Sequence, residues 1–164
     1  MKRVFIPIAL IAVAAVVAIV AAGGGSAKSG TNPSTASPPA GAAAAAIGTR
    51  TTALGTFVTD ASGKTLYLFE ADKPNVSNCS SACLSVWPAF VAGARAPHAR
   101  GAAMAGRLGM TKPQNGKSIV TYNGHPLYYF AGDQKPGATT GQGLNQFGGG
   151  WYVVTPAGGK IDKG

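Results

Sequence analysis

A ten-residue stretch occurs twice in this chain of 164 residues, and it constrains the fold more than any other feature. The first copy, GKTLYLFEAD, spans residues 63–72, and the second, GHPLYYFAGD, spans residues 124–133. Both follow the pattern G-x-x-L-Y-x-F-x-x-D at a spacing of 61 residues, which continues upstream without a gap. Further along, Trp87 and Trp151 lie 64 residues apart, so a small insertion separates them. Similarity at a fixed spacing indicates an internal duplication of one structural unit.

A turn signal lies inside each copy of the repeat, between two apolar segments. The signal is Ser-Gly at residues 62–63 and Asn-Gly at residues 123–124. Asn-Gly between apolar segments is the strongest short signal of a β-hairpin, because both residues accept the positive φ that a tight turn needs. The sequence therefore predicts two hairpins, which span residues 57–69 and 118–130.

The segment that follows the first turn, LYLF, is apolar at every position. Side chains alternate along a strand, so Tyr67 and Phe69 are expected on one face and Leu66 and Leu68 on the other. A strand that is apolar on both faces is typically covered on both sides. We therefore expect this strand to lie at the centre of the fold.

These patterns predict an all-β, antiparallel fold in which two similar repeat units pack into a small barrel or sandwich. The units span about residues 47–92 and 108–155. Each unit alone would expose an aromatic face, so neither is expected to fold alone. One short helix or turn is expected near the two cysteines, over residues 80–86, and it should end before Pro88 because proline disfavours helical backbone in the residue before it.

Three regions of different composition follow one another along the chain. Residues 1–22 are a short basic start followed by an apolar run, which is typical of an export signal and long enough to span a bilayer. A cleaved signal peptide and an uncleaved membrane anchor both fit, and both place the rest of the chain outside the cytoplasm. Residues 23–46 have the composition of a disordered low-complexity linker. The folded domain is expected over residues 47–161.

The chain is strongly basic, with fourteen Lys and Arg against five Asp and Glu and a net charge of +9. Such an excess favours anionic partners, here cell-envelope components such as anionic polymers or a lipid surface. Nucleic acid is not the expected partner, because the basic residues are scattered and no recognition-helix pattern is present. We expect an extracytoplasmic protein that is tethered to the membrane through its N-terminal segment or secreted after cleavage.

The repeated motif resembles the hallmark Y-x-[FWY]-x-x-D of a family of bacterial secreted repeat proteins and predicted lipoproteins. The pattern C-x-x-x-C-x-x-x-W-P at residues 79–88 is also similar to the family's sequence between its two motifs. The resemblance covers residues 47–155 and implies an exported, tandemly repeated envelope protein of unknown biochemical role. The apolar run is not followed by the cysteine that many relatives carry, so a membrane helix or free secretion would replace lipidation.

The repeated motif supplies the candidate site residues, for which two interpretations are open. In the structural interpretation, which we favour, the rings fill the core and each aspartate accepts hydrogen bonds from turn amides after the strand. In the other, the aromatic faces and the carboxylates form a ligand-binding patch twice. The residues concerned are Tyr67, Phe69, Asp72, Tyr128, Phe130 and Asp133.

Cys79 and Cys83 are the two cysteines of the chain, and an exported protein is expected to join them in a disulfide. A catalytic redox pair usually has two residues between its cysteines, whereas this pair has three. Positions i and i+4 of a regular helix lie farther apart than a disulfide allows. The bonded segment is therefore expected to be a turn or a distorted helix start.

A third set of candidates, His98, Met104 and Met110, offers weak metal ligands. Imidazole and thioether groups bind copper, but the spacing is loose and no second histidine is near. The other histidine, His125, follows the Asn-Gly turn and is expected to be a solvated turn residue. No cofactor is expected, and no set of nucleophile, base and orienting residue can be assembled, so we do not expect an enzyme. The sequence favours a non-catalytic binding or structural module of the envelope. The alternative is an extracytoplasmic redox or metal protein that uses copper or haem.

Overall fold

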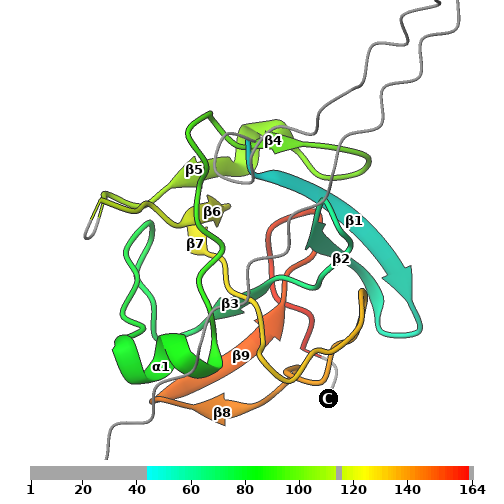
Figure 1. The fold of residues 1–164 in the computed structure, drawn as a ribbon. Helices are drawn as coiled ribbons and strands as arrows, with labels where there is room; N and C mark the ends of the chain where they lie inside the picture. Colours follow the sequence, from blue (N-terminus) through cyan, green and yellow to red (C-terminus); the bar gives the residue numbers. More distant parts are fainter. Residues whose placement is uncertain (1–43, 114–115, 163–164) are drawn as a thin grey trace, which may run out of the picture. The chain divides into compact units, whose positions relative to one another are not determined.

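The computed structural model of the protein describes residues 44–113 and 116–162 (Figure 1). The predicted signal or anchor at residues 1–22 and most of the predicted linker fall outside this part of the chain. No helix among the described residues is long and apolar enough to cross a membrane. In chain order the elements are β1 (Ala46–Thr52), β2 (Gly55–Asp60), β3 (Tyr67–Phe69), α1 (Ser81–Val86), β4 (His98–Ala99), the 3₁₀ turn η1 (Ala105–Arg107), β5 (Leu108–Met110), β6 (Val120–Tyr122), β7 (His125–Pro126), β8 (Asn145–Gln146) and β9 (Gly149–Val153).

The duplication is visible in two hairpins that pair in the same register. In the first, β1 runs antiparallel to β2 and Gly48 faces Thr59; in the second, β5 runs antiparallel to β6 and Gly109 faces Thr121. From β1 to β5 the spacing is the expected 61 residues, but from β2 to β6 it is 62. The connection from β5 to β6 is therefore one residue longer than that from β1 to β2. The turn after β2 is one residue longer than the turn after β6, which restores the spacing of 61 at the repeated motif.

The first predicted hairpin, over residues 57–69, forms from its turn as far as Leu66. The backbone N–H of Asp60 donates to the carbonyl of Lys64 at 2.9 Å, but β3 then leaves β2 and pairs with β9. Beyond the turn, the N–H of Leu66 donates to the carbonyl of Val58 at 3.2 Å and Thr59 is bridged to Thr65. The prediction is therefore wrong only for residues 67–69. All three residues of β3 are buried, and on the side away from β9 the backbones of Tyr67 and Tyr128 exchange two hydrogen bonds. β3, a strand of the first repeat that is buried on both faces, is thus held between two segments of the second repeat rather than beside β2.

The second predicted hairpin is confirmed at its turn. β6 pairs with β7 around Asn123 and Gly124, whose φ angles are 53° and 83°. Positive φ at both positions is what a two-residue hairpin turn requires, and Asn-Gly supplies it with little strain. The pairing ends at Leu127, whose backbone N–H donates to the carbonyl of Val120 at 3.0 Å, because the next residue, Tyr128, pairs with the first repeat.

The segment that follows each repeat's tryptophan pairs with the other repeat. β9 runs beside β3, where Val153 faces Tyr67. In the corresponding position after α1, Ala89 forms an isolated bridge with Tyr128. These two pairings are equivalent. Tyr67 and Tyr128 occupy the same motif position, and Ala89 and Val153 are 64 residues apart, which is also the spacing of the two tryptophans. Each repeat thus completes the strand pairing of the other, and the two units are interlocked.

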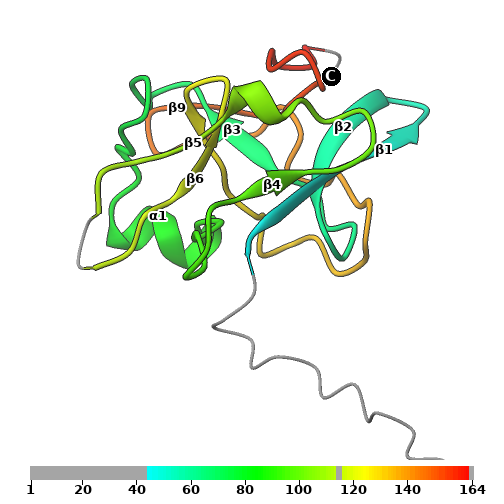
Figure 2. The same ribbon diagram turned by 90° about the horizontal axis from the view of Figure 1, so that it is seen from above.

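The predicted all-β fold with one short helix beside the cysteines is confirmed. The strands form three small sheets in the orders β2-β1-β4, β3-β9-β8 and β5-β6-β7. Figures 1 and 2 show the β1–β2 hairpin and the β5–β6 hairpin on opposite sides of β3. The sheets do not close into a barrel within the described residues. Pairing is antiparallel except between β1 and β4, which run parallel at Ala46 and Ile47.

Two clusters of buried side chains lie on the two faces of β3. Tyr67 and Phe69 belong to one cluster, and Leu66 and Leu68 belong to the other. The alternation along the segment therefore predicted the faces correctly. The first cluster contains most of the aromatic rings and both cysteines, while the second is largely aliphatic. The repeated motif lies at the boundary between the two.

Candidate functional site

The hydroxyl groups of the motif tyrosines bind the motif aspartates of the opposite repeat. Tyr67 Oη donates to Asp133 Oδ2 at 2.7 Å, and Tyr128 Oη donates to Asp72 Oδ2 at 2.7 Å. Between these contacts the two tyrosine backbones are joined by hydrogen bonds of 2.9 and 3.0 Å. The four residues therefore form a reciprocal arrangement that one repeat cannot make by itself.

Each motif aspartate also organises the turn that follows its strand. Asp72 Oδ1 accepts the backbone N–H of Asn78 at 2.6 Å, and Asp133 Oδ1 accepts that of Thr140 at 2.9 Å. Burial raises the pKa of Asp72, and the hydrogen bonds from Asn78 and Tyr128 oppose this rise. Because each carboxylate binds both a hydroxyl and a turn amide, it is fixed in position and its turn is fixed with it.

Burial keeps three tyrosine hydroxyls protonated. It raises the pKa values of Tyr67, Tyr128 and Tyr129 far above the usual range, and a nearby carboxylate adds to each rise. The third of these, Tyr129, donates to Asp60 Oδ2 at 3.0 Å. The sequence did not indicate this contact. Tyr129 is not part of the repeated motif, because the first repeat has Leu68 at that position, and no pattern connects Tyr129 with Asp60. Each of the three protonated hydroxyls donates a hydrogen bond to an aspartate and so links distant segments of the fold.

Four aromatic rings form a stack across the centre of the molecule. Phe69 stacks on Trp151 with ring centroids 4.2 Å apart, and Trp151 stacks on Trp87 at 3.9 Å. Phe130 packs on the other side of Trp87 at 4.5 Å. Each phenylalanine thus contacts the tryptophan of the other repeat. Both indole N–H groups donate to Gln146, at 2.9 and 3.2 Å, so the polar edges of the stack are satisfied internally.

The glycine-rich segment at residues 133–147 packs against this stack. It contains β8, and Gly141 within it is buried. A Cβ atom at Gly141 would lie 2.7 Å from the Trp87 ring and 3.0 Å from the Phe130 ring. The close approach of backbone to rings therefore requires glycine at this position.

Cys79 and Cys83 form a disulfide with their Cα atoms 5.2 Å apart, which confirms the predicted pairing. Cys79 precedes α1, whose N-cap is Ser80, and Cys83 lies in the first turn of the helix. The helix therefore starts inside the bridged segment, as the geometric argument predicted. Both cysteines are buried in the same cluster as the aromatic stack, so the bridge attaches α1 to the core.

The three weak metal-ligand candidates have different neighbours. His98 Nε2 accepts a hydrogen bond from Arg100 at 3.2 Å, and the sulfur of Met104 accepts one from Arg107 at 3.3 Å. Met110, on β5, is 46% exposed. Over residues 44–113 and 116–162, no three His, Cys, Asp or Glu side chains gather into a group that would hold a metal ion.

A cleft of about 250 Å³ lies beside the end of β3, and the sequence did not indicate it. We expected His125 to be a solvated turn residue, but it is half-buried in this cleft and burial lowers its pKa. Residues distant in sequence converge here, which explains why no motif marks the cleft. Its lining residues are Leu68, Phe69, Glu70, Asp72, His125 and Lys160.

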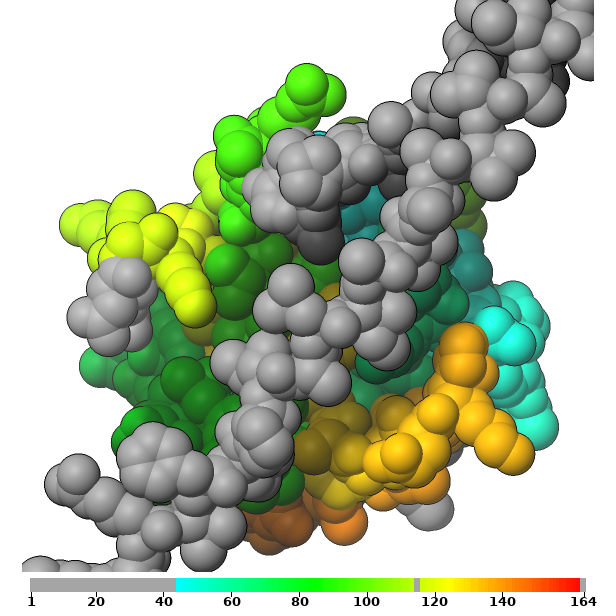
Figure 3. Space-filling model, in the orientation of Figure 1, coloured from blue at the N-terminus to red at the C-terminus, as the bar shows by residue number. Residues whose placement is uncertain are grey.

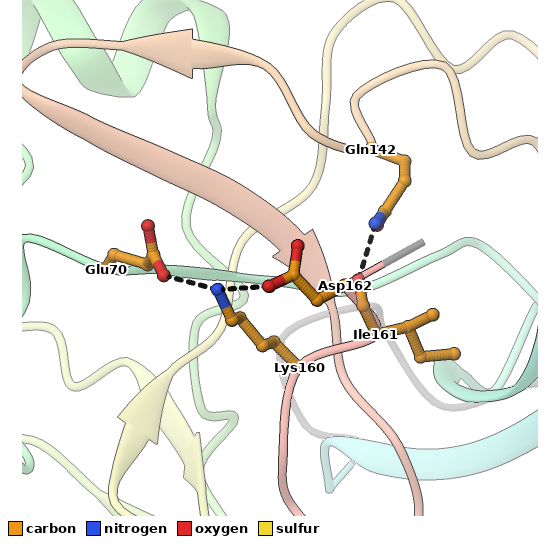
Figure 4. A network of polar contacts seen from close by, with 5 residues as sticks. All are labelled: Glu70, Gln142, Lys160, Ile161 and Asp162. Atoms are coloured by element: carbon orange, nitrogen blue, oxygen red, sulfur yellow. Dashed lines mark hydrogen bonds and ion pairs between the residues drawn. The ribbon is translucent and has the colours of Figure 1, made fainter. Parts of the chain in front are cut away.

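All five acidic side chains of the chain are engaged by other residues. Three accept hydrogen bonds from the tyrosines described above, and the other two, Glu70 and Asp162, each lie 2.9 Å from Lys160 Nζ (Figure 4). These hydrogen bonds raise the pKa of Lys160 above its usual range. Next to these ion pairs, Gln142 Nε2 donates a hydrogen bond to the carbonyl of Ile161 at 2.6 Å. In the described part of the chain, the other nine Lys and Arg side chains form no ion pair.

Comparison with known proteins identifies a family but no activity. The family model Lipoprotein_15, described as a secreted repeat of unknown function, matches residues 48–91 and 109–155. Each matched segment contains one copy of the tyrosine–aspartate motif, and together they cover more than half of the chain. No curated protein and no solved structure matches. The resemblance inferred from the motif is thus confirmed, and the chain belongs to this family of secreted repeat proteins of unknown function.

Proposed function

We propose that the protein is a non-catalytic binding module of the cell envelope that holds an anionic envelope component. The observation that carries this proposal is the distribution of charge. Every acidic side chain contacts a tyrosine or Lys160, whereas nine cations of the described residues form no ion pair. These cations are Arg50, Lys64, Lys73, Arg95, Arg100, Arg107, Lys112, Lys117 and Lys135.

The described residues carry ten Lys and Arg against five Asp and Glu, so the domain has a net charge of +5 and a positive field around it. Such a field raises the local concentration of anions and speeds their encounter with the protein. At physiological ionic strength it extends about 8 Å, so it acts on polymers or surfaces that approach closely. A secreted protein meets such partners in the envelope, whether residues 1–22 remain as a tether or are removed by cleavage.

The state of the motif residues supports a non-catalytic role. The hydroxyls of Tyr67 and Tyr128 are protonated donors, and Asp72 and Asp133 accept from them and from turn amides. A general base or nucleophile needs a lone pair directed at a substrate. In this arrangement the motif groups are directed at one another.

The test is binding of the full chain to labelled polyphosphate, followed by fluorescence polarisation. We expect binding that is lost between about 0.05 M and about 0.5 M salt, because screening shortens the reach of surface charge. Neutral dextran should not bind. Changing Lys117 and Lys135 together to Gln should weaken the binding, whereas changing both to Arg should preserve it. Salt-independent binding or no binding would overturn the proposal, and a stoichiometric transition metal or a haem band in the purified chain would favour the redox or metal alternative.

A further inference from the structure

Two adjoining grooves form an amphiphilic surface that the fold does not use. One has a volume of about 640 Å³ and the other about 480 Å³, and both are lined by Thr111. They contain four of the six large hydrophobic side chains that are exposed among the described residues. These four are Val76 (45% exposed), Leu84 (36%), Val91 (39%) and Met110 (46%). We call this region the apolar groove surface.

The floor of the apolar groove surface is held by backbone pairing. Val91 forms an isolated bridge with Ile119, and the backbone N–H of Thr111 donates to the carbonyl of Ile119 at 2.9 Å. Leu84 projects from α1 at one border, and Met110 lies on β5 at the other. Both views of the ribbon place α1, β5 and β6 on the same side of the molecule (Figures 1 and 2), and their atoms form the left side of the space-filling view (Figure 3). The backbone that carries Val91, Thr111 and Ile119 is therefore fixed by hydrogen bonds within the fold.

Three lysines border the apolar groove surface. Lys112 and Lys117 line the two grooves, and Lys73 is bridged to Val76. All three are exposed and belong to the cations without an ion pair in the described residues. No acidic side chain lines either groove. Apolar side chains next to unpaired lysines match a partner that has an apolar interior and anionic groups at its surface.

The chain enters the domain beside this surface. Ala44, the first described residue, lines a small cavity together with Val91, which also lines one of the grooves. Upstream, residues 4–22 are the apolar run, and residues 23–43 connect it to the domain. A connection of that length spans at most roughly 75 Å, so an apolar run inserted in a bilayer would keep the domain close to it and raise the effective concentration of the surface.

We infer that the apolar groove surface docks on an anionic lipid bilayer, with its four apolar side chains in the headgroup–acyl boundary and its lysines at lipid phosphates. This inference deepens the proposed function and rests on it. Apolar contact and attraction to anionic lipid act together at such interfaces. The apolar run of the chain itself is the other candidate occupant, but it contains no acidic residue and would not match the lysines.

The test uses the lysines as reporters of contact in the full chain, reconstituted in vesicles. Amine-labelling rates are measured by mass spectrometry in vesicles of phosphatidylglycerol with phosphatidylcholine and in vesicles of phosphatidylcholine alone. Each docked lysine multiplies the docked population by about fivefold on an anionic membrane, so three lysines together multiply it by about a hundredfold. We therefore expect labelling of Lys73, Lys112 and Lys117 to slow by at least about tenfold in the anionic vesicles only. Lys64 and Lys135, which lie outside the grooves, should label equally in both.

Two variants complete the test. Changing Val76, Leu84, Val91 and Met110 to Ser should abolish the protection while the domain still melts in one cooperative transition, because none of the four belongs to the buried core. Changing Lys64 and Lys135 to Gln should leave the protection intact. Equal labelling in both vesicles, or equal slowing at all five lysines, would overturn the inference. If polyphosphate still binds in that case, the proposed function stands. Protection that persists in phosphatidylcholine vesicles or in detergent would instead identify the apolar run or a second copy as the occupant, and would also overturn it.

Discussion

Tyr67, in the first repeat, donates its hydroxyl hydrogen bond to Asp133, in the second, at 2.7 Å. The same contact in the opposite direction joins Tyr128 to Asp72. Each motif is therefore completed by the other copy, and the strand pairing and the aromatic stack repeat this exchange. The duplication produces one interlocked domain, and damage to either repeat is expected to affect both.

Coupling between the two repeats can be measured with a double-mutant cycle. Tyr67→Phe removes one hydroxyl and Asp133→Ala removes its acceptor. Because the two groups share a hydrogen bond, we expect an interaction free energy of about 0.5–3 kcal/mol between these substitutions. The same-repeat pair, Tyr67→Phe with Asp72→Ala, shares no hydrogen bond and should be additive within about 0.5 kcal/mol. Urea unfolding supplies all the free energies.

A matched control for the cycle is Tyr152→Phe, since the Tyr152 hydroxyl makes no hydrogen bond within the described residues. That variant should unfold like the wild type, whereas Tyr67→Phe should cost about 1–3 kcal/mol, because it removes a hydrogen bond to the half-buried carboxylate of Asp133. Equal coupling for the cross-repeat and same-repeat pairs would contradict the reciprocal arrangement.

The aromatic stack distinguishes the structural interpretation of the motif from the ligand-patch interpretation. Phe69→Ala and Phe130→Ala should each cost about 3–5 kcal/mol, because a large ring is lost from a packed core. Each variant should still melt in one transition, since the repeats share the stack. Phe147→Ala is the control, because that ring is 47% exposed, and it should change stability by less than about 0.5 kcal/mol. Near-normal melting of both stack variants, with loss of polyphosphate binding, would favour a ligand patch.

His125 predicts an acid-sensitive contribution to stability. Burial lowers its pKa below the ordinary 6.5, so the unfolded chain takes up the proton first. The contribution is therefore complete above pH 6.5 and is lost as the pH falls toward the folded pKa. Asp72, in the same cleft, acts in the opposite sense, because its raised pKa makes the folded state the stronger proton acceptor. In urea unfolding from about pH 8 to about pH 5, His125→Gln should flatten the decline. Parallel pH curves for the two proteins would refute this role.

The disulfide predicts a small effect on stability. A bridge between residues four apart closes a short loop, so its loss should cost only about 2 kcal/mol in the chain-entropy description. Changing both cysteines to Ala should lower the melting temperature of the whole domain without splitting the transition, because both residues are in the shared core. Non-reducing mass analysis of protein from its own compartment should find no free thiol; two alkylatable thiols would contradict the bridge.

Much of the fold followed from local patterns in the sequence. The Asn-Gly turn, the two faces of β3 and the helix start at the disulfide depend on residues close together in the chain. The exchange between repeats could not be predicted in this way. Asp72 and Asp133 occupy the same position of the motif, so the sequence does not show which of them accepts the hydrogen bond from Tyr67. The contact of Tyr129 with Asp60 and the cleft around His125 escaped for a related reason. They join one repeat to the other or to the C-terminal segment, and neither periodicity nor turn chemistry specifies such partners.

The start of the folded domain gives the last prediction. β1 begins at Ala46, which pairs in parallel with His98, and the carbonyl of Ala45 accepts the His98 backbone N–H at 2.9 Å. A chain that starts at residue 44 retains both contacts and should melt at the same temperature as the full chain. A chain that starts at residue 47, the boundary expected from the sequence, leaves that N–H without its partner and should lose about 1–3 kcal/mol. Calorimetry of both truncated chains measures the difference. A lower melting temperature for the chain that starts at residue 44 would show that residues 1–43 contribute to stability and are more than a tether.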